Sequence, residues 1–490
     1  MTAPSATGSA APGTGPPDSA RNPFAVRNPG LHALIGIGRA DCTPPHRAPI
    51  NNWGAADVSR ADRIAQPLTA TVLTVGELDS SAPPSLVWVS LDLGWWRLSE
   101  GEARLRTAIA DRLGVPPTHV LVSLSHTHAG PAIDPTSSDL AEQADVLAYL
   151  DVLLETVLTA ADTAVADAAP ALLEWGLGSC QLAWNRDQWL AAEDRFVCGF
   201  SPDEPADAAL LVGRVTDAPT PTTPGRLRAV IVNYACHPTT FGPANSAISG
   251  DYVSIARDLV EQAVGAPMLF VQGASGELAP RRQYQAGNPA GDDSVRANGD
   301  QLGYAVLSTL AGMLPAGERL RPQATVESGA PLGIWALTPD DAVDRRVQLR
   351  HRSVTVPRND AASRWGAVTD LSPAAARERD RRAAMIDRLA GTGEYRIPVT
   401  ACRLGDAVLV AQPGEAYSAL QVDLRSRFPG RAVVVANLAG GAHHGYLPPK
   451  AAYARNLYQV WQTPAGAGAL ELVLDACVEM VGELLGEDPG

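Results

Sequence analysis

Residues 125–131 read Ser-His-Thr-His-Ala-Gly-Pro and directly follow the run His-Val-Leu-Val-Ser-Leu at 119–124. The apolar run predicts a buried strand, which the Gly-Pro pair ends. Side chains two residues apart point to the same side of an extended chain, so we expect His126 and His128 on one face at the strand end. Two imidazoles so placed bind a metal ion or transfer protons. The alternative is that they are structural histidines, hydrogen-bonded to the backbone.

The charge and hydropathy of the chain exclude several classes of partner. The 490 residues carry a formal net charge of −14, which argues against binding to nucleic acid or to an anionic membrane surface. No window holds the roughly 18 to 20 uninterrupted apolar residues of a membrane-spanning helix. We therefore expect a small-molecule substrate, no nucleic acid and no membrane. The sequence does not indicate an oligomeric state.

The amino-terminal segment and the cysteines bear on the cellular compartment. Residues 1–27 are rich in Ala, Pro, Gly, Ser and Thr and lack the basic start and apolar centre of a signal peptide. We predict a disordered leader over residues 1–30 and a cytoplasmic location. The six cysteines include no Cys-x-x-Cys pair, so no disulfide framework is expected.

Apolar strand-like runs alternate with helix-like stretches along the rest of the chain. This alternation predicts an α/β fold with a mixed sheet covered by helices on both faces. No linker divides the chain after residue 30, so residues 31–490 are expected to form one large catalytic domain. The predicted strands include 68–75, 85–94, 119–124, 227–235, 267–272, 403–411 and 432–436, and the predicted helices are 99–113 (capped by Ser99), 139–169, 252–263, 297–313, 373–389, 416–427 and 465–485.

Potential metal ligands recur where predicted strands end. His126 and His128 follow one strand, His237 follows a second and Glu415 a third. In open α/β sheets, functional groups gather beyond the carboxyl ends of the strands. Two or three histidines, one carboxylate and an open position make up a catalytic zinc site. Zinc lowers the pKa of its bound water to about 7, so the sequence predicts a metal-dependent hydrolase.

Each of these residues also has an interpretation that involves no metal. His237 precedes a proline and fits a buried turn histidine. Glu415 precedes a predicted helix, where a carboxylate stabilises the helix dipole. His443 and His444 are interpreted as polar residues of a loop without a specific role, and Cys236 as a small buried hydrophobic residue.

Several further motifs occur in a fixed order between residues 34 and 458. They are GIGRADCTPP, SLDLG, SHTHAGP, WNRD, NYACHPTT, SGDY, VQGASGELAP, QPGEAYS and GYLPPKAAYARNLY. In order and spacing they resemble the catalytic domain of the neutral, non-lysosomal ceramidase family, whose members are zinc amidases. The resemblance implies that catalytic domain, without the β-sandwich that follows it in ceramidases.

The resemblance also implies roles for individual residues. The implied zinc ligands are His126, His237, Glu415 and Tyr446. His128 then transfers protons and is not a ligand. Arg186 matches an active-site arginine of the family, and Tyr458 matches a tyrosine that faces the substrate carbonyl.

One position departs from the family pattern. The family has a serine, thought to be catalytic, directly before a proline, whereas this chain has Ala279 before Pro280. We expect a zinc-dependent, amidase-type hydrolase that acts on C–N bonds other than peptide bonds. Metal-activated water is the expected nucleophile, and a soluble molecule rather than ceramide the expected substrate. A catalytically silent zinc-binding homologue and an acyl transferase using the same site are the alternatives.

Overall fold

The computed structural model describes residues 24–50, 53, 58–137, 139–219, 225–284, 291–359 and 394–487, with five further residues between 376 and 384. Most of the predicted leader and most of the predicted helix at 373–389 lie outside the described residues. At the end of the leader, Phe24 is buried, and the first strand begins at Gly30.

The larger sheet has eight strands and is mixed, as predicted. Only the β13–β11 and β4–β5 pairs are parallel; the other neighbours are antiparallel. In spatial order the strands are β13 (Met268–Gln272), β11 (Leu227–Tyr234), β10 (Ala209–Asp217), β6 (Ala169–Ser179), β1 (Gly30–Asp41), β3 (Thr69–Gly76), β4 (Leu86–Leu91) and β5 (Val120–Leu124).

A second sheet of four strands lies against the first. Its order is β17 (Val347–Val356), β18 (Tyr395–Leu404), β19 (Ala407–Ala411) and β21 (Ala432–Ala436). The single strand predicted at 403–411 is wrong, because the chain turns back at Gly405, whose φ of 67° lies in the left-handed region. Glycine adopts this conformation without a steric penalty, so a tight turn forms where the apolar pattern alone indicates continuity.

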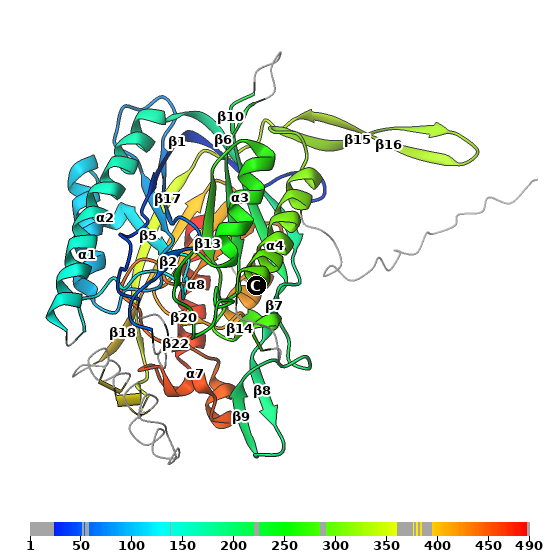
Figure 1. Ribbon diagram of the computed structural model, residues 1–490. Coiled ribbons are helices and arrows are strands. Elements are labelled where there is room, and N and C mark those ends of the chain that lie inside the picture. The colour runs from blue at the N-terminus through cyan, green and yellow to red at the C-terminus, as the bar shows by residue number, and fades with distance from the viewer. Residues whose placement is uncertain are drawn as a thin grey trace, which may run out of the picture.

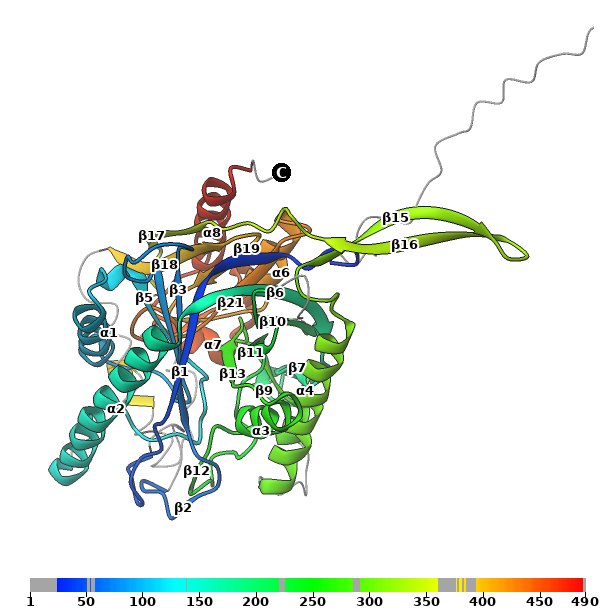
Figure 2. The same cartoon turned by 90° about the horizontal axis from the view of Figure 1, so that it is seen from above.

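The two sheets and their helices form four layers (Figure 2). Apolar side chains of both sheets share one core, which includes Ile35, Trp88, Leu409 and Val434. The prediction of helices on both faces of the sheet is therefore corrected, since one face of each sheet packs on the other sheet. On the outer faces, α1 (Ser99–Leu113), α2 (Leu140–Asp167), α3 (Tyr252–Val264) and α4 (Asp292–Gly312) cover the larger sheet, and α6 (Ala419–Arg427) and α8 (Ala469–Leu485) cover the smaller one.

Helix α2 shows why these helices pack closely. Its buried residues, among them Tyr149, Leu153 and Val157, recur at a helical spacing and form one apolar face. This face rests on β1 at Gly36, where a side-chain carbon would overlap the backbone of α2. Glycine at this position therefore allows the helix and the strand to touch.

The larger sheet curls so that its two edges approach each other. Ser90 in β4 donates a hydrogen bond of 2.7 Å to the carbonyl oxygen of Phe270 in β13, at the opposite end of the strand order. Asn233 in β11 donates to the carbonyl oxygen of Val435 in β21 at 2.9 Å, which joins the second sheet to the same region. The carboxyl ends of β5, β11 and β21 are thereby brought together.

Shorter elements surround this region. The short elements are β2 (Arg63–Ile64), β7 (Ala183–Asn185), β8 (Asp187–Leu190), β9 (Arg195–Cys198), β12 (Ala247–Ile248), β14 (Leu278–Pro280), β20 (Glu415–Ala416), β22 (Tyr446–Leu447), α7 (Tyr458–Trp461), and the 3-10 turns Pro117–His119, Arg281–Tyr284 and Lys450–Arg455. In Figure 1, β8, β9, β22 and α7 lie below the main sheets, and the hairpin of β15 (Glu318–Glu327) and β16 (Pro331–Pro339) projects to one side. In the described part of the chain, no helix is long and apolar enough to cross a membrane.

The start of α4 and the cap of α1 differ from the prediction. Helix α4 begins at Asp292, five residues before the predicted start at 297, and two aspartates in its first turn interact favourably with the helix dipole. Helix α1 spans 99–113 as predicted, but its N-cap residue is Leu98, and Ser99 does not cap it.

Candidate active site

His126 follows β5 in an unusual backbone conformation. Its φ of 66° is left-handed, which costs a residue other than glycine roughly 1–2 kcal/mol. Such strain is typical of functional sites. The chain is therefore not extended between His126 and His128, and the reason given above for their proximity is wrong. Their rings nevertheless lie together, with centroids 4.9 Å apart.

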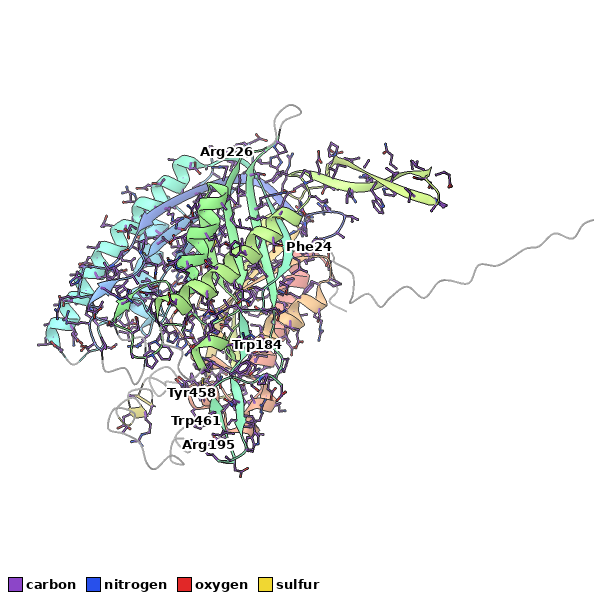
Figure 3. All side chains as sticks on the ribbon, turned by 45° about the vertical axis from the view of Figure 1, so that its right-hand side comes forward. Phe24, Trp184, Arg195, Arg226, Tyr458 and Trp461 are labelled. Carbon is purple, nitrogen blue, oxygen red and sulfur yellow. The ribbon has the colours of Figure 1, made fainter. Side chains whose placement is uncertain are left out.

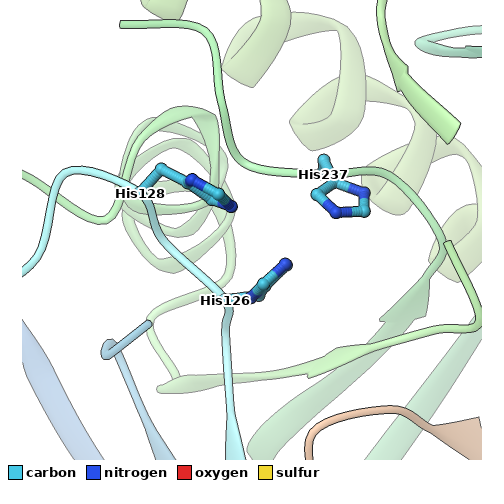
Figure 4. Close-up of side chains that lie close together, drawn as sticks. All are labelled: His126, His128 and His237. Atoms are coloured by element: carbon cyan, nitrogen blue, oxygen red, sulfur yellow. The ribbon is translucent and has the colours of Figure 1, made fainter. Parts of the chain in front are cut away.

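His237 joins this pair from the loop after β11. Figure 4 shows the rings of His126, His128 and His237 directed toward a common space. One nitrogen from each ring lies within 4.8 Å of the others. The segment with His126 and His128 and the segment with His237 are more than 100 residues apart in the sequence, and the curl of the larger sheet brings them together.

The surroundings of His237 indicate which of its nitrogens is protonated. Its Nδ1 lies 3.0 Å from the carbonyl oxygen of Leu278, which can only accept a hydrogen bond. Burial, followed by the positive charge of Arg186, lowers the pKa of His237 to about 3, so the ring is neutral and carries one N–H. That proton belongs on Nδ1. The Nε2 lone pair then faces Glu415 Oε2 at 2.8 Å.

Glu415 is the acidic centre of the cluster. Burial alone would raise its pKa, but electrostatic interactions, first of all that with His126, lower the pKa well below the usual value. Its Oε1 accepts a hydrogen bond of 2.7 Å from Nε2 of His443, a buried residue interpreted above as a polar loop residue without a specific role. That interpretation is wrong, because the loop after β21 turns His443 toward the site.

These donors fit a bound zinc ion. A carboxylate oxygen facing the lone pair of a neutral imidazole is unfavourable unless a cation lies between them. Nε2 of His126 lies 3.3 Å from Glu415 Oε2 and is buried without a hydrogen-bond partner among the described residues. Two ligand atoms on a tetrahedral zinc lie about 3.3 Å apart, since each bond is about 2.0–2.1 Å. The His126–Glu415 separation matches this spacing, and the His237–Glu415 separation of 2.8 Å would open by about half an ångström.

His128 lies beside this group of donors. Both of its ring nitrogens are covered and have no hydrogen-bond partner in the described part of the chain. Burial, followed by the electrostatic interaction with His126, lowers the pKa of His128 well below its ordinary value, so the ring is neutral. The indole rings of Trp53 and Trp95 each lie 4.9 Å from its ring, centroid to centroid.

Arg186, between β7 and β8, brings a positive charge into the site. Its Nη2 donates to the carbonyl oxygen of Gly276 at 2.7 Å and to the hydroxyl of Tyr446 at 3.2 Å, and lies 3.2 Å from Nε2 of His237. Tyr458, labelled in Figure 3, begins α7, and its ring centroid lies 6.0 Å from that of Tyr446.

A buried network holds the segments that carry these side chains. The carboxylate of Asp187 accepts hydrogen bonds from Tyr417 at 2.9 Å and from Gln459 at 2.8 Å. Asp187 is next to Arg186 in the chain, and Gln459 is next to Tyr458. The network therefore fixes α7 relative to the arginine.

Ala279 lies near this group, in β14. It is buried and pairs with Trp184 of β7. The two neighbouring peptide carbonyls on its amino-terminal side accept hydrogen bonds from site residues: Glu277 O from the amide of Arg186 and Leu278 O from the amide of His237, at 2.9 and 3.0 Å.

The structure thus places every residue predicted for the site in one region. His126, His237 and Glu415 lie in direct contact, His128 lies beside them, and Arg186 connects His237 to Tyr446, next to Tyr458. Three residues that contact the predicted site residues, His443, Trp53 and Trp95, were missed. A signal existed for His443 and Trp95, since each follows a predicted strand within seven residues, where functional groups gather.

Comparison with solved structures identifies the fold. A structure described as ceramidase complexed with C2 matches with a TM-score of 0.66 and 18% identity, covering 94% of this chain and 76% of that one. Neutral ceramidase from Pseudomonas aeruginosa matches with a TM-score of 0.65 and 19% identity, covering 94% and 75%. No protein-family model and no curated protein sequence matches. The chain therefore has the fold of the neutral ceramidase structures, and the resemblance expected from its motifs is confirmed at the level of the fold.

Proposed function

We propose that the protein is a zinc-dependent hydrolase that cleaves an amide or related acyl bond in a small soluble substrate. One observation carries the proposal. A buried carboxylate, Glu415, faces the lone pair of His237 and the unpartnered Nε2 of His126. In protein sites, buried lone pairs that converge in this way are satisfied by a metal cation.

His126, His237, Glu415 and Tyr446 would hold the ion. When bound, zinc makes hydroxide available near neutral pH by lowering the pKa of its water to about 7. The remaining steps belong to the side chains around it. The hydrogen bond that His237 Nδ1 donates to Leu278 O fixes the His237 tautomer, and the bond from His443 fixes the Glu415 carboxylate, as outer partners of metal ligands do.

The substrate carbonyl would lie between Arg186 and Tyr458. A buried guanidinium favours negative charge nearby, such as the charge that develops on a carbonyl oxygen during attack. The hydroxyl of Tyr458 adds a neutral hydrogen-bond donor. The Asp187 network holds both residues in place before the substrate arrives, so little reorganisation is needed during the reaction.

His128 would transfer the proton. A neutral imidazole accepts a proton from the attacking water and can donate it to the leaving nitrogen. Its lowered pKa favours the neutral form, and neither ring nitrogen is engaged by another described residue. The two flanking indoles limit the movement of the ring and exclude water from its faces.

A second candidate is a zinc-binding protein without catalytic activity. Ala279 favours it, because an alanine supplies no nucleophile and no proton where the resembling family has a serine. The hydrolase assigns no step to that position, so turnover separates the two candidates.

The test is metal analysis of His126→Ala together with a hydrolysis screen of N-acyl amides and lactones. We expect the variant to lose both stoichiometric zinc and turnover. His351→Ala is the matched control, because His351 is an exposed histidine of β17 and should change neither. Full turnover in His126→Ala refutes the mechanism. Stoichiometric zinc in the wild-type protein with no turnover across the screen favours the silent binder.

A further inference from the structure

The hairpin of β15 and β16, called the arm (residues 318–339), stands away from the body. Figures 1 and 2 show it projecting as a two-stranded ribbon, and its base is joined to the body by the amide of Leu320, which donates to Val26 O at 2.9 Å. An isolated two-stranded hairpin is at best marginally stable in water. A ribbon of this length therefore needs a further surface to pack against.

The composition of the arm indicates the nature of that surface. Five large apolar side chains of the arm are between 38% and 52% exposed: Val326, Leu332, Ile334, Trp335 and Leu337. Figure 3 shows the side chains of the arm extending into solvent on both sides of the ribbon. Contiguous apolar surface of more than a few hundred Å² is rare on monomers and marks an interaction site.

The strand register places apolar groups on both faces of the arm. Near the tip, Val326 pairs with Leu332, and Ile334 lies on the same face as Leu332. Nearer the base, Trp335 and Leu337 point to the opposite face. A flat partner surface would cover the apolar side chains on only one face of the arm. The partner must therefore contact the arm on both faces.

The arm carries no net charge, so an acidic partner would not repel it. Its only charged residues are Glu318, Arg319, Arg321 and Glu327, which sum to zero, whereas the whole chain carries −14. A neutral, apolar extension makes contact with an acidic body without adding like-charge repulsion, and it keeps two acidic bodies apart.

We propose that the arm is exchanged between two copies of this chain in a two-fold dimer. Nine paired positions at about 3.3 Å each make a ribbon about 30 Å long, and two strands about 4.8 Å apart make it about 10 Å wide. Each arm then presents about 300 Å² on each of two faces. Two exchanged arms and the surfaces that they cover bury about 2,400 Å², above the roughly 1,200–2,000 Å² of a standard specific interface.

The test is the mass of the full chain in solution, by light scattering and by sedimentation over a micromolar concentration series. We expect twice 51.3 kDa for the wild-type protein. Trp335→Asp places a charge in the interface and should raise the dimer dissociation constant by about 100-fold or more, because a buried unpaired charge costs several kcal/mol. Leu140→Asp is the matched control: Leu140 is 78% exposed on α2, outside the arm, and the variant should remain dimeric.

A deletion variant tests the arm without introducing a charge. Leu320 and Leu337 are directly paired, so residues 321–336 can be replaced by Asn-Gly, which closes a two-residue hairpin. This variant should be a monomer with an unchanged circular dichroism spectrum. A wild-type monomer at micromolar concentrations overturns the proposal. So does a dimer that survives both arm variants, or a series of growing masses, which would mean open rather than two-fold association.

Discussion

Replacing His443 tests the part of the site that the sequence did not reveal. Its Nε2 donates a hydrogen bond of 2.7 Å to Glu415 Oε1, and both side chains are buried. A hydrogen bond to a charged group is worth about 1.5–3 kcal/mol, and 1.4 kcal/mol is a factor of about ten in an equilibrium constant. We therefore expect His443→Ala to raise the zinc dissociation constant by about 10- to 100-fold, the range typical of outer partners of metal ligands.

The assay is zinc competition against a chromogenic chelator at fixed pH, with unfolding followed in parallel. His443→Gln keeps an N–H donor and should recover part of the affinity. His444→Ala is the matched control, because His444 hydrogen-bonds to the hydroxyl of Tyr395 at 2.7 Å and not to Glu415. If His443→Ala binds zinc as tightly as the wild-type protein does, the Glu415 carboxylate is not held by His443 and the assigned ligand set is wrong.

Two further predictions concern the packing and the reaction. Gly36→Ala forces a side-chain carbon against the backbone of α2, so the free energy of unfolding should fall by about 1–3 kcal/mol in urea denaturation. Gly312→Ala, where an added carbon has no neighbour within 4 Å, should not lower it. Ala279→Ser should change kcat/KM of amide hydrolysis by less than about threefold, since the proposed mechanism uses no hydroxyl there. A gain of about tenfold or more, equivalent to about 1.4 kcal/mol, would contradict this.

The elements with a strong local signal could be predicted from the sequence. The predicted helix at 99–113 and the predicted strands at 119–124 and 432–436 match the structure closely, because their apolar spacing and stop signals are local. The hairpin turn at Gly405 could not be predicted, since the apolar run continues on both sides of it. The packing of one sheet on the other could not be predicted either. A buried strand has the same apolar sequence pattern whether a helix or a sheet covers it.

The candidate site could also be predicted from the sequence only in part. The residues of the site could be named, because histidines and a carboxylate follow strands and the ordered motifs resemble a known family. The sequence by itself determined which side chains are available and that they end strands. Only the tertiary structure decided that the backbone of His126 adopts the left-handed conformation, that His443 hydrogen-bonds to Glu415 and that the arm projects from the body. The physical reason is that these features depend on contacts between segments far apart in the chain, which arise when the larger sheet curls and its edges meet.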